Sequence, residues 1–189
     1  MNRSAKKALL IVSVLLRMNC LSADSVKHTD STDIPVCLNK NAKNHKTMKG
    51  LATWGHSGKG LFYGVKLHMT TDVTRKILKI KFAGGNVHDT KMFIPLNDEL
   101  TGIFIADSGY LSKKMKELFE NKDRTMIVRP RKNMKQLSSL EWKLYKTRMN
   151  IELNFRNLKM FHGLVSSLPR SVDGYLANYI HSILSFLLV

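Results

Sequence analysis

Residues 61–87 read LFYGVKLHMTTDVTRKILKIKFAGGNV. The first half, LFYGVKLHMTTDV, is rich in aromatic and β-branched residues, which favour strands. In the second half, ILKIKFAGGNV, lysines alternate with apolar residues, the period-2 pattern of a strand with one solvated face. A short break at 74–76 separates the two halves. The stretch therefore predicts two antiparallel strands joined by a tight turn.

Further along the chain, strand and helix patterns alternate. GIFIAD at 102–107 is a short apolar run, typical of a strand buried on both faces, and RTMIVRP at 124–130 predicts another strand that ends at its proline. Helical spacing marks four segments: 89–96, 111–121, about 138 to 161 and about 172 to 188. This order predicts an α/β fold in which helices pack on a sheet.

Residues 38–60 are polar, basic and without a sustained period, so we expect a long mobile loop there. The GHSGKG within it is not a phosphate-binding loop, because Lys59 is followed by glycine where that loop needs serine or threonine. The histidines show no metal-site spacing, and Cys20 and Cys37 form no cluster. No zinc site or disulfide framework is expected.

The charge of the chain points to a polyanionic partner. Its 189 residues are enough for one domain with a sizeable core, and a hydrophobic content of 43% argues against disorder. The net charge is +17, and a compact fold with that charge repels itself unless a polyanion is near. Nucleic acid is the expected partner, ahead of an anionic membrane surface or a ribosomal-type structural role.

The two ends of the chain are apolar, but neither pattern requires a membrane. MNRSAKKALLIVSVLLRMNCLSA at 1–23 resembles a secretory signal, yet Arg17 follows the apolar run directly, which favours a short amphipathic helix leading into the first strand. YLANYIHSILSFLLV at 175–189 is shorter than the roughly 20 apolar residues of a membrane span. We expect a buried terminal helix and a cytoplasmic, nucleoid-associated protein without membrane contact.

Asp107 is the carboxylate best placed for chemistry. It ends the apolar run GIFIAD and is followed by Ser-Gly-Tyr. An aspartate there lies at the carboxyl edge of the sheet, where α/β proteins form their sites. The alternative is a cap for the helix starting near 111, but Asp107 precedes that helix by several residues.

Asp30 carries a weaker signal. In VKHTDSTDIPVC at 26–37, a short strand-like segment would end at Asp30. Asp24 and Asp33 are competing candidates, and an Asx turn is an equally good interpretation of the aspartate.

Glu152 is the one acid in YKTRMNIELNFRNLK at 145–159. At about 100° per residue, a helix places Tyr145, Arg148, Glu152 and Lys159 within an arc of roughly 60°. An apolar stripe adjoins this arc: Leu140, Leu144, Ile151, Phe155 and Leu158. An Arg148–Glu152 helix ion pair would explain only two members of the arc.

These residues resemble a known family. Tyr145, Arg148, Glu152 and Lys159 match Y-(2)-R-(3)-E-(6)-K, a signature of bacterial insertion-sequence DDE transposases. DSGY at 107–110 resembles the family's D-x-G-Y, and DSTDIPVC at 30–37 resembles its D-S-x-P-x-x-V-C. Counterparts of LFYGVKLH, GGNVHD, RPRKNMK and LPRS follow in the same order, so the resemblance extends from about residue 26 to the end.

The resemblance implies an RNase H-like catalytic domain with a mixed sheet and flanking helices. It implies that Asp30, Asp107 and Glu152 form the catalytic triad and hold two divalent cations, Mg²⁺ or Mn²⁺. Two metals about 3.5–4 Å apart would activate the attacking hydroxyl and stabilise the departing oxygen. Carboxylates are suitable ligands because Mg²⁺ prefers oxygen donors.

The resemblance also implies how DNA is held. Tyr145, Arg148 and Lys159 would position DNA phosphates beside the metals. A second basic patch follows a predicted strand end: Arg129, Arg131, Lys132 and Lys135.

The expected function is DNA nicking and strand transfer on double-stranded DNA, at terminal inverted repeats and a target, with a homodimer possible. The family usually begins with a helical region that contributes to end binding, whereas Asp30 lies only 30 residues into this chain, and Asp33 stands where the family has proline. We therefore expect residues 1–25 to be a leader helix or remnant and 26–189 to be the catalytic domain of a truncated copy. The alternatives are an inactive, non-specific DNA-binding remnant and an exported basic protein.

Overall fold

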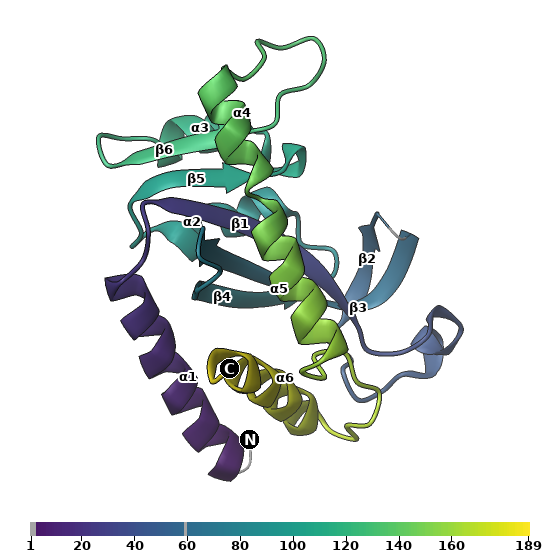
Figure 1. Cartoon of the computed structure of the whole chain (residues 1–189). Helices are drawn as coiled ribbons and strands as arrows, with labels where there is room; N and C mark the ends of the chain where they lie inside the picture. The colour runs from purple at the N-terminus through teal and green to yellow at the C-terminus, as the bar shows by residue number, and fades with distance from the viewer. Residues whose placement is uncertain (1–2, 59) are drawn as a thin grey trace.

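The computed structural model describes residues 3–58 and 60–189 (Figure 1). Met1, Asn2 and the Lys59 of GHSGKG lie outside the described residues. Within them, six strands form one mixed sheet in the order β2-β3-β1-β5-β6, with β4 beside β3. The strands are β1 Val26–Pro35, β2 Thr53–Ser57, β3 Gly60–Asp72, β4 Ile77–Gly84, β5 Gly102–Ala106 and β6 Arg124–Val128.

Six α-helices surround this sheet in the described part of the chain (Figure 1). They are α1 Arg3–Leu21, α2 Asp89–Asn97, α3 Lys113–Phe119, α4 Ser139–Lys146, α5 Met149–Met160 and α6 Val172–Leu187. Two short 3-10 helices cover Asn39–Asn44 and Ser108–Tyr110. The predicted α/β class is confirmed, and the mixed sheet with helices on its faces is consistent with an RNase H-like fold.

β3 is the centre of the antiparallel half of the sheet. It pairs with β1 along one edge, and with β2 and then β4 along the other. Gly64 lies where β2 pairing gives way to β4 pairing, and a side chain there is excluded because a Cβ would come within 2.1 Å of the Ile34 carbonyl oxygen. The predicted antiparallel pair at 61–87 is therefore confirmed as β3 and β4.

The other half of the sheet is parallel. β1 pairs with β5 and β5 pairs with β6, so the three strands run in the same direction, and β5 and β6 end at the same edge. The register aligns Thr29 with Ala106, and Ala106 with Val128. The residues that directly follow these three positions are Asp30, Asp107 and Arg129, and they are therefore neighbours across the sheet.

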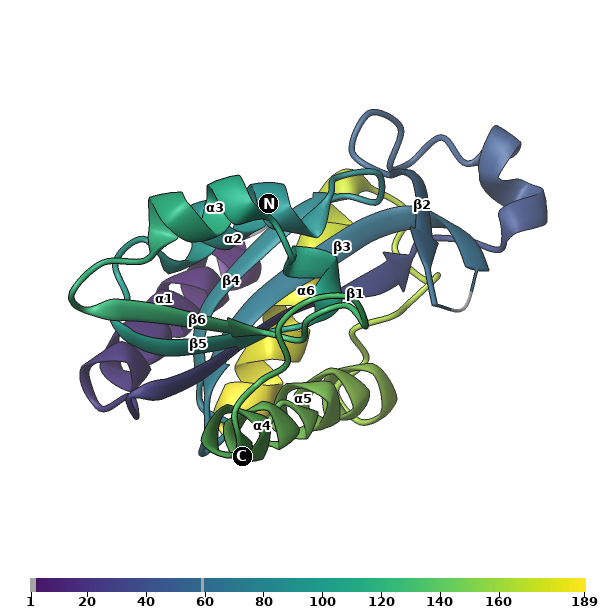
Figure 2. The same ribbon diagram turned by 90° about the horizontal axis from the view of Figure 1, so that it is seen from above.

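Helices cover both faces of the sheet. Figure 2 shows α2 and α3 on one face and α4 and α5 on the other. On the α2 side, Phe93, Phe104 and Phe119 meet edge to face with ring centroids 4.9–6.2 Å apart. On the opposite side, α5 and α6 bury apolar residues of β1, β3 and β4 in a second core cluster, which includes Ile151 and Tyr179.

The N-terminal segment is the helix α1, as favoured from its sequence, and it packs on the rest of the fold. Ala5, Ala8 and Val12 are buried, and Val12 joins the core cluster of α5 and α6. The amide of Asn19 donates to the Ile77 carbonyl at 2.9 Å, which attaches α1 to β4. Within the described part of the chain, no helix combines the length and apolar character needed to cross a bilayer.

Two expectations for the first half of the chain were wrong. Residues 38–60 are not one long loop, because a 3-10 helix and β2 lie within them and Met48 and Ala52 are buried. The strand β1 does not end at Asp30 but continues to Pro35, since β3 pairs with it residue by residue as far as Gly64. Long-range pairing stabilises segments whose local composition is polar.

The single helix expected from 138 to 161 is two helices, α4 and α5, separated at Thr147 and Arg148. The Thr147 hydroxyl donates to the Leu144 carbonyl at 2.6 Å and lies 2.7 Å from His28 Nε2. A threonine that bonds back to its own helix bends it. The apolar stripe drawn for one continuous helix therefore fails on α4, where Leu140 is 68% exposed.

We predict that Phe104→Ala lowers the free energy of unfolding by about 3–5 kcal/mol, because it opens a cavity between Phe93 and Phe119. Urea denaturation measures the loss. Leu118→Ala on the neighbouring helix is the control, since Leu118 is 68% exposed and its loss should stay within roughly 0.5 kcal/mol. Equal losses in the two variants would contradict the core described for this face.

Candidate active site

Asp30 and Asp107 lie side by side at the carboxyl edge of the parallel strands. Asp30 directly follows Thr29, Asp107 directly follows Ala106, and the register pairs Thr29 with Ala106. Each carboxylate is fixed by the next backbone amide: Ser31 N–H donates to Asp30 Oδ1 at 2.8 Å, and Ser108 N–H donates to Asp107 Oδ1 at 2.7 Å. The two acids are therefore positioned by the sheet itself.

Glu152 is brought to this edge by α5, which packs along β1 on the face seen from the front in Figure 1. Arg148 connects the helix to the sheet. Its Nη1 donates to Asp30 Oδ2 at 2.6 Å, and its Nη2 donates to Glu152 Oε1 at 2.6 Å. Because both acids contact one planar guanidinium group, their contacting oxygens lie within roughly 8 Å of each other.

The remaining residues of the predicted arc also contact acids. The Tyr145 hydroxyl donates to Asp107 Oδ1 at 3.1 Å, and Lys159 Nζ donates to Asp33 Oδ1 at 3.1 Å. Trp142 stacks on Tyr145 with ring centroids 5.5 Å apart. The structure thus brings together Asp30, Asp107 and Glu152 with the tyrosine and the arginine. Lys159, further along α5, contacts β1 at Asp33 instead.

Negative charge is concentrated at this edge. Burial raises the pKa of Asp30 to about 6; Arg148 and the Ser31 amide lower it, while Asp107 and Asp89 add to the increase. Burial alone would lower the pKa of Arg148, but the carboxylates of Asp30, Asp107 and Glu152 outweigh it and raise that pKa. A positive charge is therefore strongly favoured at this position.

The donor set suits a hard divalent cation, since its three acids offer only carboxylate oxygens. In the arrangement described, however, no three histidine, cysteine, aspartate or glutamate side chains within residues 3–58 and 60–189 are grouped closely enough to hold a metal ion. The Arg148 guanidinium lies between Asp30 and Glu152 instead. The carboxylate oxygens are suitable metal ligands, and in this structure the Arg148 guanidinium group provides the positive charge that balances them.

A comparison with protein families matches residues 21–172 to the transposase DDE domain. The chain belongs to this family. The match includes both aspartates and Glu152, and it makes the protein a transposase whose substrate is DNA. The family generally uses divalent metal ions. No curated protein and no solved structure matched the chain.

The second basic patch of the transposase begins at the same sheet edge. Val128 ends β6 opposite Ala106, and the segment that follows leads from β6 to α4. Its cationic residues are all exposed: Arg129, Arg131, Lys132 and Lys135. These four side chains are accessible to solvent.

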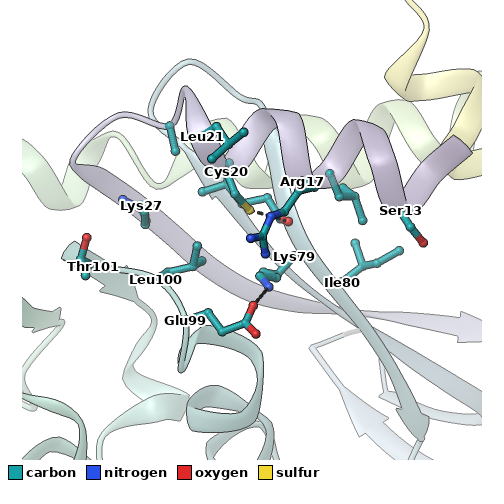
Figure 3. Close-up of a pocket in the computed structure, with 13 residues that line it drawn as sticks. Ser13, Arg17, Cys20, Leu21, Lys27, Lys79, Ile80, Glu99, Leu100 and Thr101 are labelled. Carbon is teal, nitrogen blue, oxygen red and sulfur yellow. Dashed lines mark hydrogen bonds and ion pairs between the residues drawn. The ribbon is translucent and has the colours of Figure 1, made fainter. Parts of the chain in front are cut away.

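A cavity of about 670 Å³ lies elsewhere, between α1, β4 and the segment that follows α2 (Figure 3). Arg17, Lys27 and Lys79 line it, and Lys79 is paired with Glu99. None of the predicted site residues borders this cavity. This cavity is therefore separate from the acids of the transposase.

Sequence reasoning missed the residues that surround Asp30. Asp89, the first residue of the predicted helix 89–96, accepts from Lys66 Nζ at 3.0 Å, and its charge raises the pKa of Asp30. The cap of that helix is His88, whose side chain accepts from the Thr90 backbone amide. The only signal for Asp89 was its place in GGNVHD, and no local pattern connected that motif with Asp30.

Two histidines near the site are buried and uncharged at neutral pH. His28 contacts Thr147 at the helix break, and His68 lies 3.9 Å from Asp89. Burial lowers the pKa of each to about 4, although Asp72 and Asp89 respectively oppose that change.

We predict that acidification destabilises the transposase through these histidines. Between pH 6.5 and 4 the unfolded chain takes up protons that the folded protein excludes, so stability falls as the pH falls. The gap corresponds to on the order of 3 kcal/mol for each histidine. Urea denaturation at pH 7 and pH 4.5 should show that the unfolding free energy falls less in His68→Leu than in the wild type, by about 2 kcal/mol, because pH 4.5 is still above the folded pKa.

The exposed His56 provides the control, and His56→Gln should keep the acid sensitivity of the wild type. Asp30 acts in the opposite direction, because its raised pKa makes the folded state gain stability on acidification. Asp30 is present in all three proteins, so its effect cancels in the comparison. An unchanged pH dependence in His68→Leu would show that His68 is protonated in the folded state.

Proposed function

We propose that this transposase domain nicks DNA and transfers strands by metal-assisted phosphoryl transfer, with Asp30, Asp107 and Glu152 as the metal ligands. One observation supports this most directly: Asp30 on β1 and Glu152 on α5 both accept from the Arg148 guanidinium group, and Asp107, directly after β5, is near enough to raise the pKa of that arginine. The expected cofactor is Mg²⁺ or Mn²⁺, as two ions.

Two bound cations would supply an activated nucleophile and neutralise the leaving oxygen. The protein fixes where this happens. Asp30 and Asp107 are rigid, because each is attached to a sheet strand and bonded to the following backbone amide. Glu152 is the adjustable member, with a side chain 42% exposed on α5.

In this proposal, the polar and cationic residues around Asp30 and Asp107 position the DNA. Tyr145 and Lys159, with Arg148, form the Y-R-E-K signature together with Glu152, and the exposed patch at Arg129, Arg131 and Lys132 extends the surface along the path of the backbone. With a net charge of +17, binding should weaken steeply as salt rises, since each phosphate contact releases counterions.

The proposed substrates are double-stranded insertion-sequence ends with terminal inverted repeats, and target DNA, acted on at the nucleoid by a homodimer or monomer. Every residue that this mechanism uses lies within 26–189, which we propose as the catalytic unit. Residues 1–25 contribute a leader helix that packs on it.

A second candidate function is DNA binding without cleavage. It is supported by the position of Arg148, which lies between Asp30 and Glu152 where a catalytic site would need cations. The two functions differ in whether DNA is cut, and in what a change at Glu152 does.

We predict that Glu152→Gln reduces nicking of end-bearing duplex DNA in Mg²⁺ or Mn²⁺ by at least about 100-fold, the scale of losing one electrostatic stabiliser of the transition state. DNA affinity, measured by fluorescence anisotropy, should be retained or increase because a negative charge is removed. Gel analysis of nicked products measures the activity.

The matched control is Glu117→Gln on α3, where the glutamate side chain is 64% exposed and remote from the site. Its nicking rate should equal that of the wild type. A wild-type protein that binds the DNA tightly but cuts it with neither metal would favour the second candidate.

A further inference from the structure

We propose that Arg148 is an exchangeable counter-cation, which either bridges Asp30 and Glu152 or holds a DNA phosphate, so that DNA binding and cation binding favour each other. This inference rests on the proposed function and concerns how its site is loaded. It assigns Arg148 two alternating partners in place of the fixed phosphate contact expected from the sequence.

The bridge uses the part of Arg148 that would bind a phosphate. Both terminal nitrogens are occupied at 2.6 Å, one by Asp30 and one by Glu152. A guanidinium group binds phosphate through the same fork of parallel N–H donors. The side chain is only 16% exposed, so it is not a surface arginine with spare reach. Arg148 therefore cannot keep both carboxylates and grip a phosphate with its fork at the same time.

The bridge also uses the oxygen that a cation would need. Asp30 Oδ1 accepts from the Ser31 backbone amide, which leaves Oδ2 as the oxygen for a cation, and Oδ2 is the atom that Arg148 holds. Removing Arg148 leaves Asp30 buried beside Asp107 without a counter-charge, a costly state. Cations are the natural replacement, so arginine and metal compete for one position.

Lys159 and Tyr145, the other two donors of the signature, do not compete in this way. Lys159 contacts Asp33, which is outside the proposed triad, and Tyr145 contacts Asp107 through a neutral hydroxyl. Asp33 is the residue that replaces the proline of the family motif. Lys159 thus keeps α5 aligned with β1 whether or not Arg148 is bound to the triad.

The exchange can occur without moving α5. Buried Ile151, Phe155 and Leu158 fix the helix in the core. Polar contacts also attach it to the turn between β3 and β4, where Arg75 Nε donates to Asn154 at 2.9 Å and Asn150 donates to the Val73 carbonyl at 2.8 Å. Only the Arg148 side chain needs to rotate.

Competition for one group creates coupling. DNA that takes Arg148 away from the carboxylates raises their affinity for cations, and by reciprocity cations raise the affinity for DNA by the same factor. Coupling of this kind is typically about 5- to 150-fold. A transposase built in this way would assemble its metal site when DNA is present.

The test compares wild type, Arg148→Gln and Arg156→Gln in the full chain. Arg156 is exposed on the same helix and serves as the matched control. Isothermal titration with Mg²⁺, without DNA, should show at least about fivefold tighter binding in Arg148→Gln, with a larger Mg²⁺-induced rise in Tm. Anisotropy with a short blunt duplex in Ca²⁺ or EDTA should show cation-enhanced DNA binding in wild type and Arg156→Gln, and none in Arg148→Gln.

Equal Mg²⁺ affinity in wild type and Arg148→Gln, with DNA coupling unchanged, would overturn the proposal. If Arg148→Gln does not fold, Arg148→Lys replaces it: lysine offers one nitrogen where arginine holds each acid with a separate one, so it should hold the two carboxylates less firmly, and the Mg²⁺ affinity of the variant should exceed that of the wild type. Failure of the proposed function would look different. Mg²⁺ binding that persists in Asp30→Asn and Glu152→Gln would show that the cation does not bind to these carboxylates at all.

Discussion

The parallel register of β1 and β5 is the constraint on which the site depends. It aligns Thr29 with Ala106, and the next residue on each strand is an aspartate. A shift of one residue would turn Asp30 to the opposite face of the sheet, because side chains alternate along a strand. β3 fixes this register from the other side by pairing with β1 over nine residues, from Lys27 to Pro35.

The break between α4 and α5 is the second determinant of the site. It puts Arg148 at the start of α5, where it reaches Asp30, while Tyr145 at the end of α4 reaches Asp107. The break is held by Thr147 and by the buried, uncharged His28. A polar contact with a core strand thereby helps to determine where α5 begins.

The site retains charges that a purely structural core would exclude. An arginine 16% exposed and an aspartate 18% exposed form a largely buried pair, and apolar residues of similar volume often stabilise a fold equally well. The physical reason to keep such a pair is that it exchanges partners. The chain has a net charge of +17 and belongs to the transposase DDE domain family. The proposed exchange partners are therefore duplex DNA for the arginine and divalent cations for the carboxylates.

The sequence by itself determined the secondary structure with strong local patterns: the β3–β4 pair, the apolar strand before Asp107, and the terminal helix. It also placed Arg148 and Glu152 on one side of a helix, because helical periodicity over a single turn is a local property. Only the tertiary structure decided that β1 continues past Asp30, that a strand lies within 38–60, and that a helix breaks at Thr147. Each of these depends on pairing or hydrogen bonding with residues distant in the chain, which no local pattern encodes. The same holds for the bridge from Arg148 to Asp30, in which one partner comes from a strand and the other from a helix 118 positions later.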